Sequence, residues 1–441
     1  MDGGTLKQVV ADWLEGDPLP TFVRRELAAP DLTQLTSVLA IVGPRRAGKT
    51  YFMYQLAHDL MEVSGYARED ILFVDFEDYR LLGLVPSDVS ELLASFEQLA
   101  GRRPRYLFLD EVHQLPEWSR VLRTLHNQRR YRIVVSGSNS KLLARETATE
   151  LRGRYLDALM LPFSFREKLA AAGLRVSPRT FYTSRKGTLL AAFDDYLASG
   201  GFPEVVRLQT VPERRRLLQS YFNTVFYRDI LERYNIRAKH VLDAMMSHCL
   251  GTYGELFSVS RFEKHLKGSG LPGSKRTIAN YLRYLQDAFF VIVNEKFSSS
   301  PRKRIMNPKK LYLLDTGFSG LSAGLSQNRG KLLENAVATE LVRRQQTSYY
   351  YHGRHECDFV IVRRRQPVAA IQVCWELTPR NRDRELAGLL EAMSRLGIRD
   401  GIILTHHEET MLTYSDRTVA VRPVCQWLLD GATPTPEATT A

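Results

Sequence analysis

The segment from Gly43 to Thr50 constrains this chain more than any other. It reads GPRRAGKT and fits the pattern G-x-x-x-x-G-K-[ST]; the apolar run Val38–Val42 precedes it and a helix-like segment follows. Glycines in such a loop let backbone N–H groups point at phosphate oxygens, and the following helix adds its positive N-terminal dipole. The order of strand, loop and helix therefore predicts a phosphate-binding loop rather than a glycine-containing surface turn.

Two residues of this loop have specific expected roles. Lys49 is expected to reach the β- and γ-phosphates of a nucleotide, and the Thr50 hydroxyl is expected to ligate Mg²⁺. The residues expected to contact the nucleotide are Gly43, Pro44, Arg45, Arg46, Ala47, Gly48, Lys49, Thr50 and Tyr51.

A second motif begins at Tyr106, where four apolar or aromatic residues lead into Asp110 and Glu111. Ligands of parallel sheets bind at the carboxyl ends of the strands, which is where these two carboxylates are expected. Asp110 is predicted to hold Mg²⁺, and Glu111 to polarise the water that attacks the γ-phosphate. The pair reads as a Walker B element, and the upstream loop makes a merely solvated helix start a poor alternative.

A third polar group follows the run Arg132–Ser136, whose three central residues are apolar. Ser138 and Asn139 come just after this run. One of them is expected to hydrogen-bond the attacking water, and we assign this catalytic role to Asn139. The alternative is that these residues cap a helix, because Ser and Asn are favoured at helix N-termini.

Length and composition indicate a soluble, multidomain globular chain. The 441 residues are 44% hydrophobic and 25% charged, and no apolar run approaches the roughly 18 residues of a membrane span. The N-terminus lacks the features of a signal peptide, so we expect a cytoplasmic protein without a membrane partner. The four cysteines contain no C-x-x-C pair, which argues against a zinc site or a disulfide framework. A net charge of +12 favours an anionic partner, most commonly nucleic acid.

Five short apolar runs, near residues 37–43, 71–76, 105–110, 131–136 and 155–161, alternate with helix-like segments. This alternation predicts an α/β fold with a parallel sheet that is covered on both faces.

Several motifs together resemble one family. GPRRAGKT, LFLDE, SGSNSKLL, ELRGRY, LPFSFRE and SGGFPE are similar to the prokaryotic AAA+ ATPases that carry a C-terminal domain of unknown function. The resemblance implies a P-loop sheet with a helical lid, ATP and Mg²⁺ as cofactors, ATP hydrolysis, and a ring or transient oligomer. It also implies an arginine that completes a neighbouring subunit's site. Arg152 and Arg154 occupy that place, and Arg154 is preferred over Arg152; the alternative is an ordinary helix end.

Residues 238–316 resemble a winged helix. In the piece that follows Gly273, one face is apolar, while Lys275, Arg276 and Arg283 lie away from it. Such a helix can be anchored on one side and offer donors to DNA on the other. Arg302 and Lys303 form a basic tip between two extended runs. These five residues are the DNA-binding candidates; the alternative is a protein-docking module.

The last part of the chain looks like a restriction-endonuclease-like fold of the PD-(D/E)XK class. Glu334 lies on an expected helix and Asp358 on an expected strand, but Gln372 and Cys374 stand where active members have a carboxylate and a lysine. An amide binds Mg²⁺ weakly and a thiol does not carry an ammonium charge. We therefore expect a nuclease-like fold without nuclease activity.

The predicted architecture is a P-loop AAA+ sheet with a helical lid, a winged helix and a nuclease-like α/β domain. The expected boundaries are 1–163, 164–237, 238–316, 317–430, and a disordered tail at 431–441. The expected function is Mg²⁺-dependent ATP hydrolysis coupled to double-stranded DNA binding by the basic C-terminal half. The alternatives are an ATP-driven switch that recruits a protein partner, and an ATP-gated nuclease.

Overall fold

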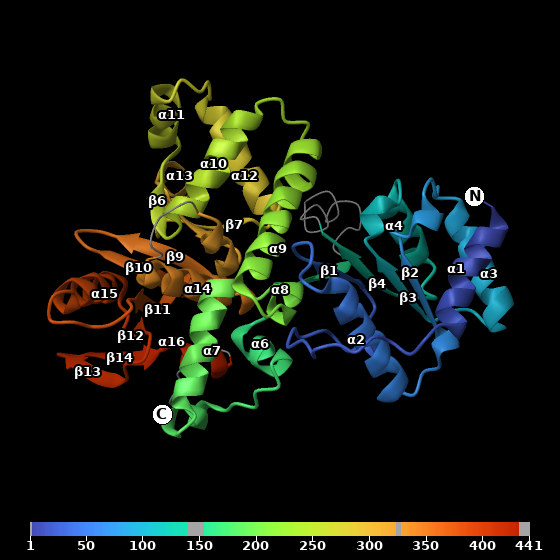
Figure 1. Ribbon diagram of the computed structural model, residues 1–441, viewed down its shortest axis with the longest axis horizontal. Helices are drawn as coiled ribbons and strands as arrows, with labels where there is room; N and C mark the ends of the chain where they lie inside the picture. The colour runs from blue at the N-terminus through green and yellow to red at the C-terminus, as the bar shows by residue number, and fades with distance from the viewer. Residues whose placement is uncertain (1, 139–153, 323–327, 432–441) are drawn as a thin grey trace. The chain divides into compact units, whose positions relative to one another are not determined.

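The computed structural model of the 441-residue chain describes residues 2–138, 154–322 and 328–431. The chain divides between Pro162 and Phe163 into two compact units, which are described separately (Figure 1). Among the described residues, none of the helices combines the length and the apolar character that a membrane crossing requires.

The first unit is built on a five-stranded parallel sheet in the order β2-β3-β4-β1-β5. Its strands are β1 (Val38–Val42), β2 (Ile71–Asp75), β3 (Tyr106–Asp110), β4 (Arg132–Gly137) and β5 (Tyr155–Leu159). Each of the five apolar runs thus forms a strand, and the prediction of a parallel sheet is confirmed. Strands β1 and β3 are buried along their whole length, as expected for strands covered on both faces.

Helices and short turns surround this sheet. They are α1 (Gly3–Glu15), η1 (Leu32–Gln34), α2 (Lys49–Glu62), η2 (Arg68–Asp70), η3 (Tyr79–Leu81), α3 (Asp88–Ala100), η4 (Val112–Gln114) and α4 (Trp118–Asn127). Helix α1 packs on β2, where the Trp13 ring stacks on Phe73 with centroids 5.4 Å apart. The Trp13 indole N–H donates to the Ile71 carbonyl, so the N-terminal helix is part of the core.

The second unit begins with a helical segment. Its elements are α6 (Phe165–Ala171), η6 (Pro178–Tyr182), α7 (Lys186–Ser199), α8 (Pro203–Arg207), α9 (Val211–Thr224) and the π-helical η7 (Val225–Glu232). The segment that we expected to form a helical lid shares its cores with the rest of the second unit. Phe165 of α6 and Phe193 of α7 are buried in one core with Phe359, whereas Phe202 and Tyr221 are buried in another with Leu285.

A helical and antiparallel module follows. Its elements are α10 (Lys239–Thr252), β6 (Glu255–Phe257), α11 (Val259–Gly268), α12 (Lys275–Asp287), β7 (Val291–Asn294), α13 (Pro301–Met306) and β8 (Lys309–Leu313). The strands pair in the order β6-β8-β7. The apolar face of α12 is buried. The basic tip contains the short helix α13, which Ser300 caps and in which Pro301 is the first residue.

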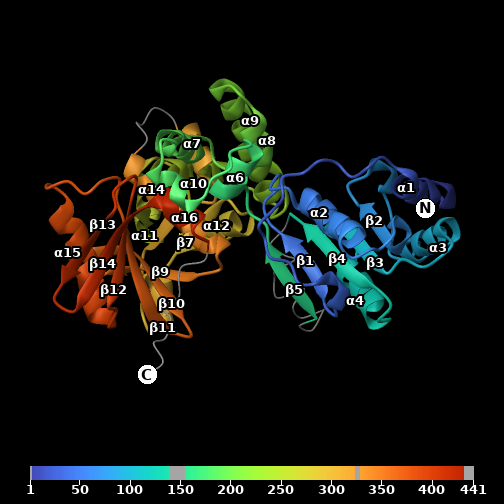
Figure 2. The same cartoon turned by 90° about the horizontal axis from the view of Figure 1, so that it is seen from below.

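The C-terminal part contains a six-stranded mixed sheet in the order β13-β14-β12-β11-β10-β9. Its elements are η8 (Thr316–Leu321), α14 (Arg329–Arg343), β9 (Thr347–His352), β10 (Glu356–Arg363), β11 (Gln366–Val373), α15 (Arg382–Leu396), β12 (Asp400–Thr405), β13 (Thr410–Tyr414), β14 (Arg417–Pro423) and α16 (Val424–Leu429). Helix α15 packs on one face of the sheet, while α14 and α16 pack on the other together with α6 and α7 (Figure 2). The sheet therefore has a buried layer on each side.

We predict that Gly388→Ala destabilises the second unit. Gly388 lies where α15 crosses β10, and a methyl group there would stand 1.9 Å from the Glu356 carbonyl oxygen. Overpacking against backbone costs about 1–3 kcal/mol. All four cysteines are buried in this unit, so thiol labelling at increasing urea reports its opening. The control is Gly187→Ala in α7, where a methyl group meets nothing within 4 Å; equal labelling midpoints for the two variants would contradict the prediction.

Candidate functional site

The phosphate-binding loop lies between the end of β1 and the start of α2. Gly48 caps α2 in the left-handed conformation, with φ of 93°, which favours glycine. Lys49 is the first helical residue, and its Nζ folds back to 3.4 Å from the Gly43 carbonyl oxygen and 3.2 Å from that of Pro44. The first N–H groups of α2 have no partner within the helix, which makes the loop suited to an anion.

Arg25 supports this loop from the segment that precedes β1. Its guanidinium donates to the Ala47 carbonyl at 2.7 Å and to the Leu161 carbonyl at 2.6 Å, and Arg25 is buried. Its backbone N–H also donates to Gln55 Oε1 at 2.7 Å. No sequence pattern indicates this role, because the partner carbonyls lie far from Arg25 along the chain.

Asp110 and Thr50 meet at the carboxyl end of β3. The Thr50 hydroxyl donates to Asp110 Oδ2 at 2.6 Å, and the Ser136 hydroxyl, at the end of β4, donates to Asp110 Oδ1. Burial raises the pKa of Asp110 to about 6, against the lowering effect of these two hydroxyls. The structure thus brings the two predicted metal-binding residues together and adds Ser136, which sequence reasoning had not assigned.

Glu111 is the partner of Lys49. Its Oε1 lies 3.2 Å from Lys49 Nζ, and its Oε2 lies 3.2 Å from His113 Nδ1 and accepts the Ser138 N–H at 2.9 Å. Burial alone would raise the pKa of Glu111, but the Lys49 charge and the His113 contact outweigh it and hold this pKa below its usual range. The buried Ser138 hydroxyl has no hydrogen-bond partner among the described residues, so a polar group remains available beside Glu111.

Other predicted residues lie at the rim of the loop or outside the described ranges. Arg45 pairs with Glu77 at 3.1 Å, and the Tyr51 side chain is 41% exposed. Arg46 has a positive φ of 66°. Asn139 and Arg152 lie outside the described residues.

Arg154 lies just before β5, and its guanidinium donates to Asn127 Oδ1 at 2.6 Å. Strand β5 runs parallel to β1 with Val38 opposite Tyr155. Arg154 therefore lies at the amino ends of these strands, whereas the phosphate-binding loop lies at their carboxyl ends. A five-residue strand spans about 16 Å. The Arg154 side chain therefore does not reach the loop of its own chain.

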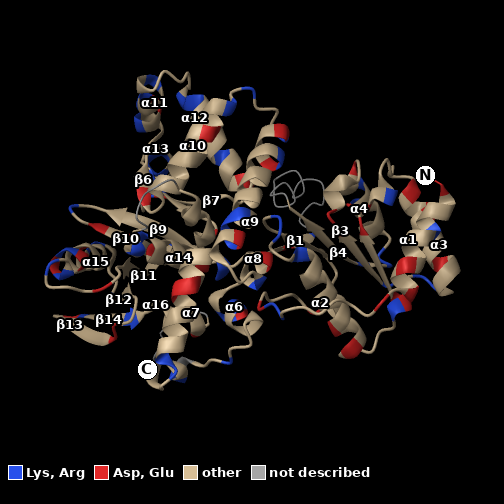
Figure 3. Ribbon diagram, in the orientation of Figure 1, with Lys and Arg blue, Asp and Glu red and all other residues tan. Residues whose placement is uncertain are grey.

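The five DNA-binding candidates lie on α12 and α13. Lys275, Arg276 and Arg283 are exposed on α12, and Arg302 and Lys303 are exposed on α13. The blue segments of the ribbon in Figure 3 mark Lys and Arg positions that recur along α11 and α12. The structure therefore leaves these cations available to a partner.

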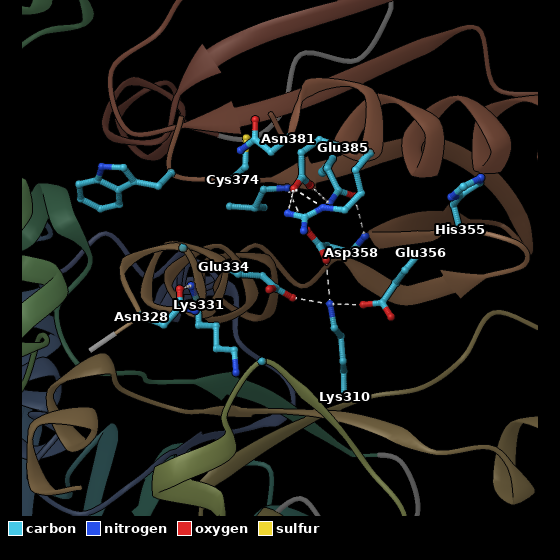
Figure 4. A pocket seen from close by; sticks show the side chains of 16 residues that line it. Lys310, Asn328, Lys331, Glu334, His355, Glu356, Asp358, Cys374, Asn381 and Glu385 are labelled. Atoms are coloured by element: carbon cyan, nitrogen blue, oxygen red, sulfur yellow. Dashed lines mark hydrogen bonds and ion pairs between the residues drawn. The ribbon is translucent and has the colours of Figure 1, made fainter. Parts of the chain in front are cut away.

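A second polar site, which we call the carboxylate pocket, has a volume of about 410 Å³. Lys310 of β8 lies at its centre, and its Nζ is 2.7 Å from each of Glu334 Oε1, Glu356 Oε1 and Asp358 Oδ1 (Figure 4). Burial opposes the charge of Lys310, but the carboxylates, Asp358 first, raise its pKa well above the ordinary value. Burial and the Asp358 charge raise the pKa of Glu334 to about 7.

The residues on β11 are engaged by their neighbours. Gln372 Nε2 donates to Glu385 Oε2 at 2.7 Å, and Gln372 Oε1 accepts the Asp358 N–H at 3.3 Å. Cys374 is buried, and burial raises the pKa of its thiol far above the ordinary value. Glu334, Asp358, Gln372 and Cys374 thus line one pocket.

Lys310 is a third residue, after Arg25 and Ser136, that sequence reasoning missed. A signal existed: in the strand Lys309–Leu313, Lys310 and Tyr312 alternate with leucines. Residues two apart share one face of a strand, so this lysine and tyrosine lie on the same face. Both are buried, and the Tyr312 hydroxyl donates to Glu334 Oε1 at 2.6 Å.

Comparison with known proteins identifies the protein families whose sequences this chain matches. Residues 36–169 match the AAA domain family, and residues 190–329 and 329–425 match the domains of unknown function DUF8612 and DUF4143. "Uncharacterized protein MJ1544" of Methanocaldococcus jannaschii is 30% identical over 435 residues, which cover 96% of this chain and 95% of that protein. An uncharacterized protein of Haemophilus influenzae is 27% identical over 342 residues, covering 77% and 83%.

A solved structure of the Aeropyrum pernix ORC1 protein in complex with DNA aligns with 78% of this chain and 93% of that one. The two share 14% sequence identity, and the TM-score is 0.28. So low a score supports neither a common fold along the chain nor a common ligand.

The M. jannaschii protein aligns with this chain almost from end to end, and the AAA domain match contains the phosphate-binding loop and the Asp110–Glu111 pair. The resemblance drawn from the motifs is thereby confirmed. The chain belongs to a prokaryotic family of AAA-domain ATPases that carry the C-terminal domains DUF8612 and DUF4143.

Proposed function

We propose that the chain binds ATP with Mg²⁺ in its first unit and hydrolyses it there. One observation carries this proposal: Lys49 and Thr50 of the loop make direct contacts with Glu111 and Asp110 at the end of β3. Phosphoryl transfer needs a cation that binds the phosphates, a hydroxyl and a carboxylate that bind the metal ion, and a second carboxylate that activates water.

The donor set of Thr50 and Asp110 fits Mg²⁺, which prefers hard oxygen ligands. Bound there, Mg²⁺ would neutralise charge on the phosphates of ATP. Asp110 must be ionised to bind a metal, and at neutral pH a carboxyl with a pKa of about 6 is mostly ionised. Ser136 fixes the orientation of this carboxylate through its hydroxyl.

Glu111 is proposed as the general base. While Lys49 lies beside Glu111, it holds the pKa of this carboxyl low, and a carboxylate with so low a pKa is a weak base. ATP phosphates compete with Glu111 for the Lys49 ammonium, because both are anionic partners of one cation. Once Lys49 turns to the phosphates, the pKa of Glu111 rises and the carboxylate can accept a proton from water. The Ser138 hydroxyl, which has no hydrogen-bond partner within the described parts of the chain, is suited to orient this water.

An arginine contribution requires a second copy of the chain. Because Arg154 lies at the sheet edge opposite its own loop, it can stabilise phosphoryl charge only in the site of another subunit. This geometry supports a homo-oligomer as the hydrolysing species. The specific activity should then rise with protein concentration in the wild type and not in Arg154→Ala; a concentration-independent rate would exclude this role.

For the second unit we propose a winged helix over residues 238–316, an inactive nuclease-like domain over 317–430 and a lid over 164–237. We assign the ATPase core to residues 1–163. The order α10-β6-α11-α12-β7-β8 with a three-stranded antiparallel sheet supports the winged helix. The nuclease-like domain is supported by helix α14, by the antiparallel pairs β9-β10 and β10-β11, and by the placement of Asp358.

The proposed partner of this unit is duplex DNA, bound by α12 and α13. The exposed cations Lys275, Arg276 and Arg283 on a helix with a buried opposite face support this role. A protein partner is the second candidate. It is favoured by Ile305 and Met306 of α13, which are 72% and 78% exposed and offer an apolar contact.

The stability of the metal-free first unit should depend on Asp110. Its pKa is about 6 when folded against 3.8 ordinarily, so between about pH 4 and pH 6 the folded state binds more protons than the unfolded chain. The free energy of unfolding therefore falls as the pH rises through this window, by up to about 3 kcal/mol. Asp110→Asn lacks this loss, so its stability relative to wild type should increase from pH 4.5 to pH 7.5.

Calorimetry in EDTA checks this prediction. Thiol labelling identifies the transition of the first unit, because the four buried cysteines of the second unit stay unlabelled through it. The control is Asp157→Asn on β5, where the carboxylate is exposed. A relative stability of Asp110→Asn that stays constant with pH would contradict the prediction.

Variants of Lys49 and Glu111 should separate ATP binding from hydrolysis. Lys49→Ala should lose both. Glu111→Gln should slow hydrolysis by about 10²–10⁴-fold, the usual effect of removing a general base, and it should bind ATP several-fold more tightly, because Lys49 loses a competing partner. Glu97→Gln, which changes a surface pair with Arg103, should match wild type. Weaker ATP binding by Glu111→Gln would contradict the proposed exchange of Lys49 between Glu111 and the ATP phosphates.

DNA affinity should depend on α12 more than on total charge. Lys275→Glu/Arg276→Glu should weaken duplex binding about tenfold or more and reduce the slope of log K against log salt by about one for each lost phosphate contact. Arg395→Glu/Arg399→Glu changes the net charge equally at exposed positions and should have little effect. Equal losses in both double variants would indicate attraction without a defined interface, and no loss in either would remove the DNA role.

A further inference from the structure

The carboxylate pocket gathers anionic groups around one point in the second unit. Glu334 comes from α14, whereas Glu356 and Asp358 come from β10, and one oxygen of each lies 2.7 Å from Lys310 Nζ. Figure 4 shows the three contacts converging on this atom. An ammonium group has three N–H donors, so the three carboxylates match the donor number of Lys310.

Three carboxylate oxygens around one point form a donor set that a divalent cation would use. We propose that Lys310 is the resident cation of this pocket, held where a divalent metal ion would otherwise bind, so that the pocket carries no metal-dependent chemistry. The inference goes beyond the proposed ATPase function and concerns another site. It rests on the three contacts of Lys310 and not on the assignment of the fold.

The burial of the cluster explains why the lysine stays in place. Lys310 is only 3% exposed, and Asp358 and Glu334 are buried beside it. Removing one partner of a buried ion pair leaves an uncompensated charge, which is strongly unfavourable. If a metal ion displaced the ammonium, the charged end of Lys310 would have to move into solvent or into another buried position. The raised pKa of Lys310 keeps it charged at physiological pH.

The neighbouring groups also do not favour a metal ion. Gln372 is occupied on both of its polar atoms, by Glu385 and by the backbone of Asp358. The second oxygen of Asp358 accepts the Val373 N–H at 2.9 Å. Within the described residues, no group of three or more His, Cys, Asp or Glu side chains has an arrangement suited to hold a metal ion.

The ligand type predicts which ion could replace the lysine. Three carboxylates from two elements suit Ca²⁺, which accepts flexible coordination by oxygens, better than Mg²⁺, which demands near-ideal octahedral geometry. A protein without the Lys310 ammonium should therefore bind Ca²⁺ more tightly than Mg²⁺. The preference is opposite to that of the proposed nucleotide site, which distinguishes the two.

The experiment uses the full chain without nucleotide, with Asp110→Asn in every protein to remove the metal site of the first unit. Calorimetric titration with Ca²⁺ alone or Mg²⁺ alone compares this parent with Lys310→Ala and with Lys309→Ala. Lys309 is the adjacent lysine on β8 and contacts Glu295 at 2.7 Å. We expect about one Ca²⁺ per chain in Lys310→Ala, bound about tenfold or more tightly than in the other two, and a rise in the urea midpoint of thiol labelling when Ca²⁺ is added.

Two results would overturn the proposal. One is Ca²⁺ or Mg²⁺ binding by the parent that Asp358→Asn abolishes, because the metal would then displace Lys310. The other is absence of Ca²⁺ binding by Lys310→Ala while its cysteines remain protected. If Lys310→Ala does not fold, the parent and its Asp358→Asn derivative decide the question: equal titrations without a bound ion support the proposal, and binding that depends on Asp358 refutes it. Either result is independent of ATP hydrolysis.

Discussion

The contact between Lys49 Nζ and Glu111 Oε1, at 3.2 Å, is the interaction on which the nucleotide site depends. Both groups are nearly excluded from solvent, and a buried charge must be compensated by a partner. In this structure each is the partner of the other. The arrival of phosphate supplies Lys49 with a new partner, and His113 and Ser138 still contact Glu111. The pair can therefore separate without leaving a carboxylate uncompensated.

Lys310 obeys the same constraint with the opposite consequence. Lys49 has one carboxylate partner and two carbonyl contacts from its own loop, which can be exchanged for phosphate oxygens. Lys310 has three carboxylate partners from two elements, and exchange would require all three to find another cation. A buried lysine is thus a mobile ligand in one unit and a fixed counter-ion in the other. The difference lies in the number of anionic partners rather than in burial.

The parts of this structure that sequence reasoning predicted are those with local causes. The apolar runs became the five strands of the first sheet because burial on both faces requires continuous hydrophobic residues, and the loop before Lys49 follows from its glycines. Asp110 and Glu111 could be placed because their positions depend on the end of one strand. By contrast, Arg25 and Ser136 act through partners distant in the chain. No periodicity records such pairings, and the shared cores of the expected lid were missed for the same reason.

Those shared cores change how nucleotide could act on the rest of the chain. Phe165 and Phe193 are buried with residues of the six-stranded sheet, and Phe202 and Tyr221 with residues of α10 and α12. The Gly201 N–H donates to Asp315 Oδ2 at 2.8 Å, across more than a hundred residues. A lid that moved alone would have to expose both cores, at a cost of several kcal/mol for the aromatic side chains. Movement of this segment with the nucleotide state must therefore carry the second unit with it, so that DNA or protein bound there would move as well.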